Sequence, residues 1–238
     1  MRRTKMLLLP SANTLKSYTG KATGEVGITE MMKKRLQAEL QCLTDMDKFV
    51  SVQIDEVALR AQEIYLKNYE TYIGGVDYGG VLDATKAGSK LANKMLTFNV
   101  SGLAANYSSP FGVFLVKDLT SEQLLELTKY VVTELEKLGF FVFQLVTDNL
   151  SVNTRLFKLL NPNESTLKCE VPHPTDPSRT IHLCFDSSHI IKNIRNQFID
   201  KNLKKKTTRT LISVTSSRCM KHKKTLFFAQ FDTSAKNI

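Results

Sequence analysis

Paired cysteines, long apolar stretches and a signal sequence are all missing from this chain. Its four cysteines are scattered and none forms a C-x-x-C pair, so we expect neither a disulfide framework nor a four-ligand zinc site. No stretch approaches the roughly 20 apolar residues that span a bilayer. MLLLP at residues 6–10 is too short for a signal peptide core. We therefore expect a soluble, intracellular protein with reduced cysteines and no membrane partner.

Common motifs of nucleotide-binding proteins and hydrolases are missing as well. The chain contains no GxxxxGK[ST] loop, no GxSxG elbow and no GxGxxG after a predicted strand. TGKATG at residues 19–24 has the wrong spacing for a phosphate loop and follows no strand, so we interpret it as an ordinary loop. Any chemistry must therefore depend on side chains outside these motifs.

The charge that is present is mostly positive and unevenly spread. The chain carries 33 Lys and Arg against 23 Asp and Glu, a net charge of +10. One basic cluster lies within residues 201–209 and a second within 218–224. Such an excess favours a polyanionic partner, either nucleic acid or an anionic membrane surface. A solvated surface without a partner explains each cluster equally well.

Hydrophobic periodicity predicts a meander of strands followed by alternating helices and strands. The 238 residues suffice for one large domain, or for a domain and part of another. Predicted strands cover 49–55, part of 72–81, 94–100, 111–116, 140–146 and 181–185, with a further candidate at 226–231. Predicted helices cover 30–44, the segment between Thr120 and Gly139, about 152–160, and a segment that starts at Ser187. This order indicates an α/β fold with a mixed sheet flanked by helices, although it contains one early strand candidate more than the simplest such fold requires.

The segment from Thr120 to 146 carries the clearest local signals. Thr120 and Gln123 have the spacing of a capping box, and Gly139 is a typical helix stop. The apolar run at 140–146 follows directly, which predicts a central parallel strand covered on both faces. This strand is therefore expected to lie in the middle of the sheet.

Two aspartates, Asp55 and Asp148, occupy positions where carboxylates of adjacent strands could meet. Asp55 shares the polar face of strand 49–55 with Ser51 and Gln53, and Asp148 follows strand 140–146. If these strands are neighbours, the two carboxylates lie close together, and a divalent cation relieves their repulsion. Hard oxygen ligands suit Mg²⁺ or Mn²⁺, and two such ions can clamp the reacting oxygens of a phosphodiester. The alternative is that each aspartate only forms a turn or caps a helix. Asp186 is a weaker candidate, because Ser187 and Ser188 make capping a simple explanation.

FDSSHIIKNIRN at residues 185–196 predicts a helix with one polar and one apolar face. The polar stripe contains His189, Lys192, Asn193 and Asn196, with Arg195 beside it. The apolar face, with Ile190, Ile191, Ile194 and Phe198, is expected to pack on the sheet. The polar stripe is more organised than a solvated helix face usually is. The candidate nucleic-acid-binding residues are Lys192, Arg195, Lys204, Lys205 and Lys206.

Five collinear segments resemble P-element-type transposases, including those that carry an N-terminal THAP zinc finger. They are LPSANTL (9–15), IDE (54–56), TDN…SVN (147–153), HP (173–174) and FDSSHIIKNIRN (185–196). The last resembles the family's D-x-x-H-L-x-K-N-x-R-N stretch and is the most specific of the five. The resemblance implies that its polar stripe is a junction that contacts either the DNA backbone or the family's inserted domain. The resemblance covers the chain from about residue 9 to about residue 200.

The resemblance implies an RNase H-like fold and DDE/D-type cut-and-paste DNA transposition with Mg²⁺ (or Mn²⁺). Asp55 matches the family's first catalytic aspartate and Asp148 its second. DNA is then the expected partner and the nucleus the expected location. Assembly of the chain into a homo-oligomer is compatible with the resemblance. The family also binds GTP, through a domain inserted in its catalytic core.

Two departures from the family's pattern affect the expected activity. The third carboxylate, a glutamate, lies beyond the GTP-binding insertion, and no residue here can be assigned to it. No C-x₂₋₄-C spacing of a THAP finger occurs near the start. We therefore expect a fragment or truncated copy that does not transpose alone. Its expected divisions are an N-terminal loop and helix (1–45), the RNase H-like domain (46–200) and a basic segment that starts the insertion (201–238).

Two other functions compatible with the sequence remain open. One is a relic domain that keeps the fold and binds nucleic acid or protein without catalysis. The other is a complete RNase H-like nuclease in which Asp186 supplies the third acid.

Overall fold

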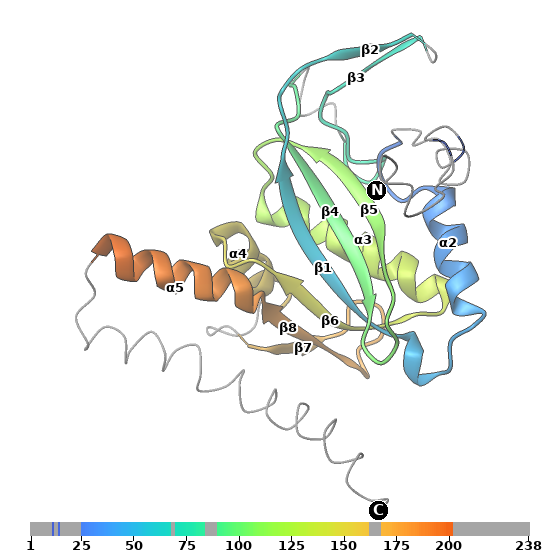
Figure 1. Cartoon of the computed structure of the whole chain (residues 1–238). Helices are drawn as coiled ribbons and strands as arrows, with labels where there is room; N and C mark the ends of the chain where they lie inside the picture. Colours follow the sequence, from blue (N-terminus) through green and yellow to red (C-terminus); the bar gives the residue numbers. More distant parts are fainter. Residues whose placement is uncertain are drawn as a thin grey trace, which may run out of the picture.

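A six-stranded mixed sheet forms the centre of the computed structural model, which describes residues 11, 14, 25–67, 70–83, 90–161 and 168–201, with side chains in the last helix to Gln197 (Figure 1). Its strands are β1 (Phe49–Ala58), β4 (Lys94–Gly102), β5 (Ser108–Val116), β6 (Phe141–Thr147), β7 (Glu170–Pro172) and β8 (Thr180–Phe185). A second, two-stranded sheet contains β2 (Ile64–Leu66) and β3 (Thr71–Ile73). The helices are α2 (Glu30–Leu40), α3 (Ser121–Leu138), α4 (Ser151–Leu159) and α5 (Ser187–Lys201), and a short 3₁₀ helix covers Met46–Lys48.

The strand order β5-β4-β1-β6-β8-β7 combines an antiparallel meander with a parallel centre. Strand β1 pairs antiparallel with β4, which pairs antiparallel with β5. On its other side β1 runs parallel to β6, and β6 runs parallel to β8. The predicted α/β class with a mixed sheet is therefore confirmed, as is the central parallel position of β6.

Helices cover one face of this sheet, and the other face carries polar side chains. Alternate residues of β1 such as Val52 and Ile54 are buried, whereas Gln53 and Asp55 between them are exposed. Figure 1 shows α3 lying behind the sheet. Leu127, on the buried stripe of α3, belongs to the same hydrophobic core as Val52 and Ile54 of β1. The sheet is thus amphipathic, and its polar face is accessible to a ligand or a partner.

Helix α3 is set by its own sequence at both ends. The Thr120 hydroxyl accepts from Gln123 N–H at 3.2 Å while the Gln123 side chain accepts from Thr120 N–H at 3.0 Å. Gly139 ends the helix with φ 104°, the left-handed conformation that glycine adopts most easily. Both capping predictions are confirmed.

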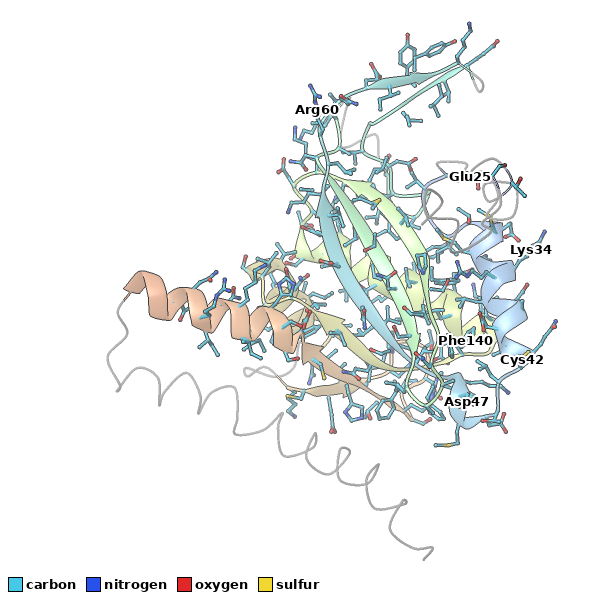
Figure 2. All side chains as sticks on the ribbon, in the orientation of Figure 1. Glu25, Lys34, Cys42, Asp47, Arg60 and Phe140 are labelled. Atoms are coloured by element: carbon cyan, nitrogen blue, oxygen red, sulfur yellow. The ribbon has the colours of Figure 1, made fainter. Side chains whose placement is uncertain are left out.

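The surplus strand candidate at 72–81 forms no strand of the main sheet and pairs with it through a single bridge, from Asp77 to Leu115 of β5. Only Thr71–Ile73 is a strand, paired with β2 in a hairpin that projects from one end of the sheet (Figure 1). Gly74 follows with φ 119°, which breaks the extended run. Beyond it, Gly75 and Asp77 make only isolated bridges. Figure 2 shows Arg60 near the base of this hairpin and Asp47 near the opposite end of β1.

Several predicted boundaries differ from the structure. The first helix ends at Leu40 and not at residue 44, and β1 continues to Ala58. Strand β5 starts before Pro110 because it lies at the sheet edge, where a residue without an N–H is tolerated. The segment predicted as a loop at 161–180 contains edge strand β7, which was too short to show periodicity. The strand candidate at 226–231, the loop at 19–24 and the basic clusters lie outside the described residues. Among those that are described, no helix is long and apolar enough to cross a bilayer.

Candidate functional site

A pocket of about 340 Å³ opens on the polar side of the sheet, where β6 and β8 end beside the middle of β1. It contains all three aspartates singled out in the sequence, Asp55, Asp148 and Asp186. Its other lining residues are Gln53, Ile54, Asn99, Val146, Thr147, Ser188 and His189. The carboxyl ends of neighbouring parallel strands meet here, which is the usual place for a site in an open α/β sheet.

The parallel register of β1 and β6 brings Asp55 and Asp148 to neighbouring positions. Ile54 lies opposite Thr147 in that register, so each aspartate is the next residue along its own strand. Asp55 is exposed, and its Oδ1 accepts from the backbone N–H of Glu56 at 2.8 Å. The condition on which the sequence prediction depended, that the two strands are neighbours, is met.

Asp148 is held by the first turn of the following helix. Its Oδ1 accepts from the backbone N–H of Leu150 at 3.1 Å and from the Asn153 side-chain amide at 2.6 Å. Asn153 is buried, with 9% of its surface exposed, so this donor has little freedom to turn away. Helix α4 therefore fixes the orientation of the Asp148 carboxylate.

Asp186 caps helix α5, as its neighbouring serines suggested. Its Oδ1 accepts from both the hydroxyl and the backbone N–H of Ser188, each at 2.8 Å. These bonds to Ser188 lower the pKa of the Asp186 carboxyl below its ordinary value, since they stabilise the ionised form. Its backbone N–H donates to the Thr147 carbonyl at 2.8 Å, which joins the start of α5 to the end of β6.

The three carboxylates share one arrangement. In each, Oδ1 is anchored by the chain itself, and for Asp55 and Asp148 Oδ2 has no hydrogen bond to a described residue, whereas the Asp186 carboxyl is also bonded by the backbone N–H of His189. Open carboxylate oxygens are the donors that Mg²⁺ and Mn²⁺ prefer, so the donor chemistry fits such an ion. Within the described ranges, however, no three Asp, Glu, His or Cys side chains are grouped closely enough to form a metal site by themselves. The roles of Asp55 and Asp148 as catalytic metal ligands stay a prediction.

The polar stripe of α5 begins in this pocket and leads away from it. His189 lines the pocket, and Lys192, Asn193, Arg195 and Asn196 lie exposed beyond it. Arg195 donates to the Asn196 side chain from Nη2 at 3.1 Å. Lys204, Lys205 and Lys206 lie outside the described residues.

The apolar face of α5 is only partly used. Ile190 and Ile194 are half-buried, but Ile191 is 67% exposed, so the prediction that it packs on the sheet is wrong. Figure 1 shows α5 extending outward from the end of β8, away from the sheet, which is consistent with this exposure.

The HP motif at residues 173–174 supplies a buried histidine and not a ligand of the pocket. The side chain of His173 is fully buried, and its Nδ1 accepts from the Thr175 N–H at 3.2 Å. Its Nε2 lies 3.0 Å from Glu136 Oε1 but is not aligned with it for a hydrogen bond. Burial lowers the pKa of His173, although the Glu136 charge acts in the opposite direction. Arg179 also binds Glu136, at 2.6 Å, so the motif fastens the segment before β8 to α3.

Three residues of the site have roles that the sequence does not predict, namely Asn153, Gln53 and Asn99. Asn153 belongs to the SVN segment, but its contact with Asp148 depends on how α4 folds back. Gln53 had been placed on the polar face with Asp55, and the alternation of strand 94–100 gives Asn99 a similar position. Only the register between β1 and β4 shows that these two amides lie opposite each other beside the aspartates.

The sequence family described as "TNP-like, RNase H N-terminal domain" matches residues 24–161. The chain belongs to this family. The match spans β1 to α4 and hence both Asp55 and Asp148. The resemblance to P-element-type transposases and the RNase H-like fold are therefore confirmed.

Two known proteins are similar to this transposase domain over most of its length. The human DNA transposase THAP9 is 24% identical over 197 residues, which cover 82% of this chain and 22% of THAP9. A structure described as the Drosophila P element transposase strand transfer complex superposes with a TM-score of 0.59 at 21% identity, covering 81% of this chain and 38% of the other. The chain thus spans about a fifth of the curated relative and less than half of the solved one, and the second similarity establishes the fold alone.

Proposed function

We propose that this chain is the part of a P-element-type DNA transposase that supplies two metal-binding carboxylates, Asp55 and Asp148, for DNA strand cleavage and transfer. The observation that supports the proposal best is the pocket where the parallel pairing of β1 with β6 ends, in which both carboxylates have one anchored and one open oxygen. DNA is the proposed partner and the nucleus the proposed location. The polar face of the sheet would lie against the DNA.

The residues of the chain have distinct parts in this proposal. Asp55 and Asp148 would offer Oδ2 to Mg²⁺ or Mn²⁺, and Asn153 keeps Asp148 oriented. A divalent ion bound there stabilises negative charge on the reacting oxygens of a phosphodiester. Lys192 and Arg195, exposed on α5 next to the pocket, would contact the DNA backbone. GTP remains an expectation from the family, and we assign no described residue to it.

Calorimetric titration with Mn²⁺ tests the metal site. Wild type is compared with Asp55→Asn and Asp148→Asn, which keep the shape of the side chain and remove its charge. Asp45→Asn is the matched control, since Asp45 is a highly exposed aspartate before β1 that pairs with Lys48 at 2.8 Å. We expect each pocket variant to bind Mn²⁺ more weakly and the control to behave as wild type. Equal affinities in all four proteins would refute the proposed site.

A non-catalytic module that binds nucleic acid or protein is the second candidate. It is favoured by the lack of a third side chain that completes a metal cluster in the described part of the chain. Nicking of supercoiled plasmid with Mn²⁺ separates the two functions: nicking that is lost in Asp55→Asn excludes a relic. If nicking of an RNA–DNA hybrid is instead lost in Asp186→Asn, the third acid is Asp186 and the chain acts as a nuclease.

A further inference from the structure

Two neutral amides, Gln53 and Asn99, lie beside the aspartates on the polar face of the sheet. They are direct partners in the antiparallel register of β1 and β4, and both line the pocket. Direct partners have Cβ atoms about 4.5–5.5 Å apart, so the two side chains leave the sheet together. We refer to Gln53 and Asn99 as the amide pair.

The neighbours of the amide pair on the same face already have hydrogen-bond partners. Thr97 donates its hydroxyl to the carbonyl of Asp55 at 3.2 Å. Ser101 and Ser108 share a hydroxyl contact of 3.3 Å. Neither amide of the pair has a hydrogen-bond partner among the described residues, although Asn99 is half-buried. Each carboxamide can donate two hydrogen bonds, so the pair presents four open N–H groups at the rim of the pocket.

The charge of the pocket explains why neutral donors suit this position. Three aspartates line it, and the described lining residues include no lysine or arginine. A DNA phosphate that approaches is repelled by these carboxylates, and a lysine here would pair with an aspartate, as Lys94 pairs with Glu56 at 2.7 Å. An amide N–H attracts a phosphate oxygen without neutralising a carboxylate that is needed for a metal ion.

We propose that the amide pair donates hydrogen bonds to backbone phosphate oxygens of the DNA strand that enters the Asp55–Asp148 pocket. The inference rests on the proposed function and adds two positioning residues to it. Gln53 precedes Asp55 by two residues on β1, a separation of about 6.7 Å in a strand. That distance is similar to the spacing of successive phosphates along an extended DNA strand. The pair would therefore hold the phosphate next to the one at the aspartates.

Fluorescence anisotropy with the full chain tests this assignment. The probe is a fluorescein-labelled DNA duplex with a single-stranded overhang, in Ca²⁺ so that binding is measured without cleavage. The variants are Gln53→Ala and Asn99→Ala. Their matched controls are Gln37→Ala, an exposed position on α2, and Asn106→Ala, an exposed position between β4 and β5.

We expect each variant of the amide pair to bind DNA about 10-fold to 100-fold more weakly than wild type, the loss of one hydrogen bond to a charged acceptor. Gln53→Glu and Asn99→Asp keep the side-chain shape but should bind more weakly still, because a carboxylate repels phosphate. The slope of affinity against salt should stay that of wild type, because a neutral donor releases no counterion. Mn²⁺ affinity without DNA should be at least that of wild type in all four variants.

Each other outcome has a defined meaning. If wild type binds DNA and the amide variants match their controls, the amide pair has no role and the proposed function stands. If the alanine variants lose Mn²⁺ affinity in parallel with DNA affinity, they act on the metal site, and the inference is overturned. If wild type does not bind the probe at all, both the inference and the proposed DNA-binding function are overturned.

Discussion

Replacing Asn153 by alanine should separate the orientation of Asp148 from its charge. The Asn153 amide donates to Asp148 Oδ1 at 2.6 Å, and Asn153 is 9% exposed. A hydrogen bond to a charged group contributes about 1.5–3 kcal/mol. Asp148 is only half-buried and keeps its bond from the Leu150 N–H, so water can replace part of what is lost. We therefore expect the free energy of unfolding to fall by about 1–2 kcal/mol.

The larger effect of Asn153→Ala should be on metal binding. Groups that orient a metal-ligating carboxylate typically change affinity by about 10-fold to 100-fold when removed. Urea unfolding gives the stability change, and calorimetric titration with Mn²⁺ gives the affinity. Asn149→Ala is the matched control, since Asn149 is an exposed neighbour that only accepts from the Thr154 hydroxyl at 3.4 Å. If Asn153→Ala loses stability as expected but binds Mn²⁺ as tightly as the control does, the orienting role is wrong.

Two further changes test the fold around the site. Folding lowers the pKa of His173 below its ordinary value of 6.5, so near that pH the imidazole binds more protons in the unfolded chain than in the folded one. The contribution of His173 to the unfolding free energy is therefore complete above about pH 6.5 and falls as the pH drops. His173→Gln should reduce the slope of unfolding free energy against pH below 6.5 by up to about 1.4 kcal/mol per pH unit, and an unchanged slope in urea titrations would contradict this. Gly79 and Gly80 both have positive φ, but a Cβ on Gly79 would meet the Gly27 Cα at 2.6 Å whereas one on Gly80 meets nothing within 4 Å. Gly80→Ala should therefore cost about 1–2 kcal/mol of unfolding free energy and Gly79→Ala clearly more, and equal costs would show that the close approach to Gly27 relaxes freely.

The elements that the sequence predicts well are those set by contacts close along the chain. Helix α3 is specified by its capping box, its apolar period and Gly139, all within its own residues. The positions of β1 and β6 along the chain are predicted by the alternation at 49–55 and by the apolar run at 140–146. By contrast, the β2–β3 hairpin depends on the backbone conformation at Gly74, and the exposure of Ile191 depends on where α5 leaves the sheet. Neither of these has a periodic signal.

The candidate site shows the same division. Asp55 and Asp148 were found because a polar residue on a strand face and an aspartate after a buried strand are visible in the sequence. The two aspartates are adjacent because β1 pairs parallel with β6. The sequence alone does not show that these two strands are neighbours. Asn153 and Asn99 reach the pocket through the fold of α4 and the register of β4, and no local pattern gives either of these.

The place of β1 between β4 and β6 also affects how a newly synthesised chain acquires its site. The ribosome produces β1 first, and β6 follows only after β4, β5 and α3 have emerged. Until then the side of β1 that will pair with β6 is an open edge, which invites pairing with other chains. Pairing across such sequence separations is slow because loop closure must precede it. Asp55 and Asp148 therefore cannot come together before Thr147 has left the exit tunnel.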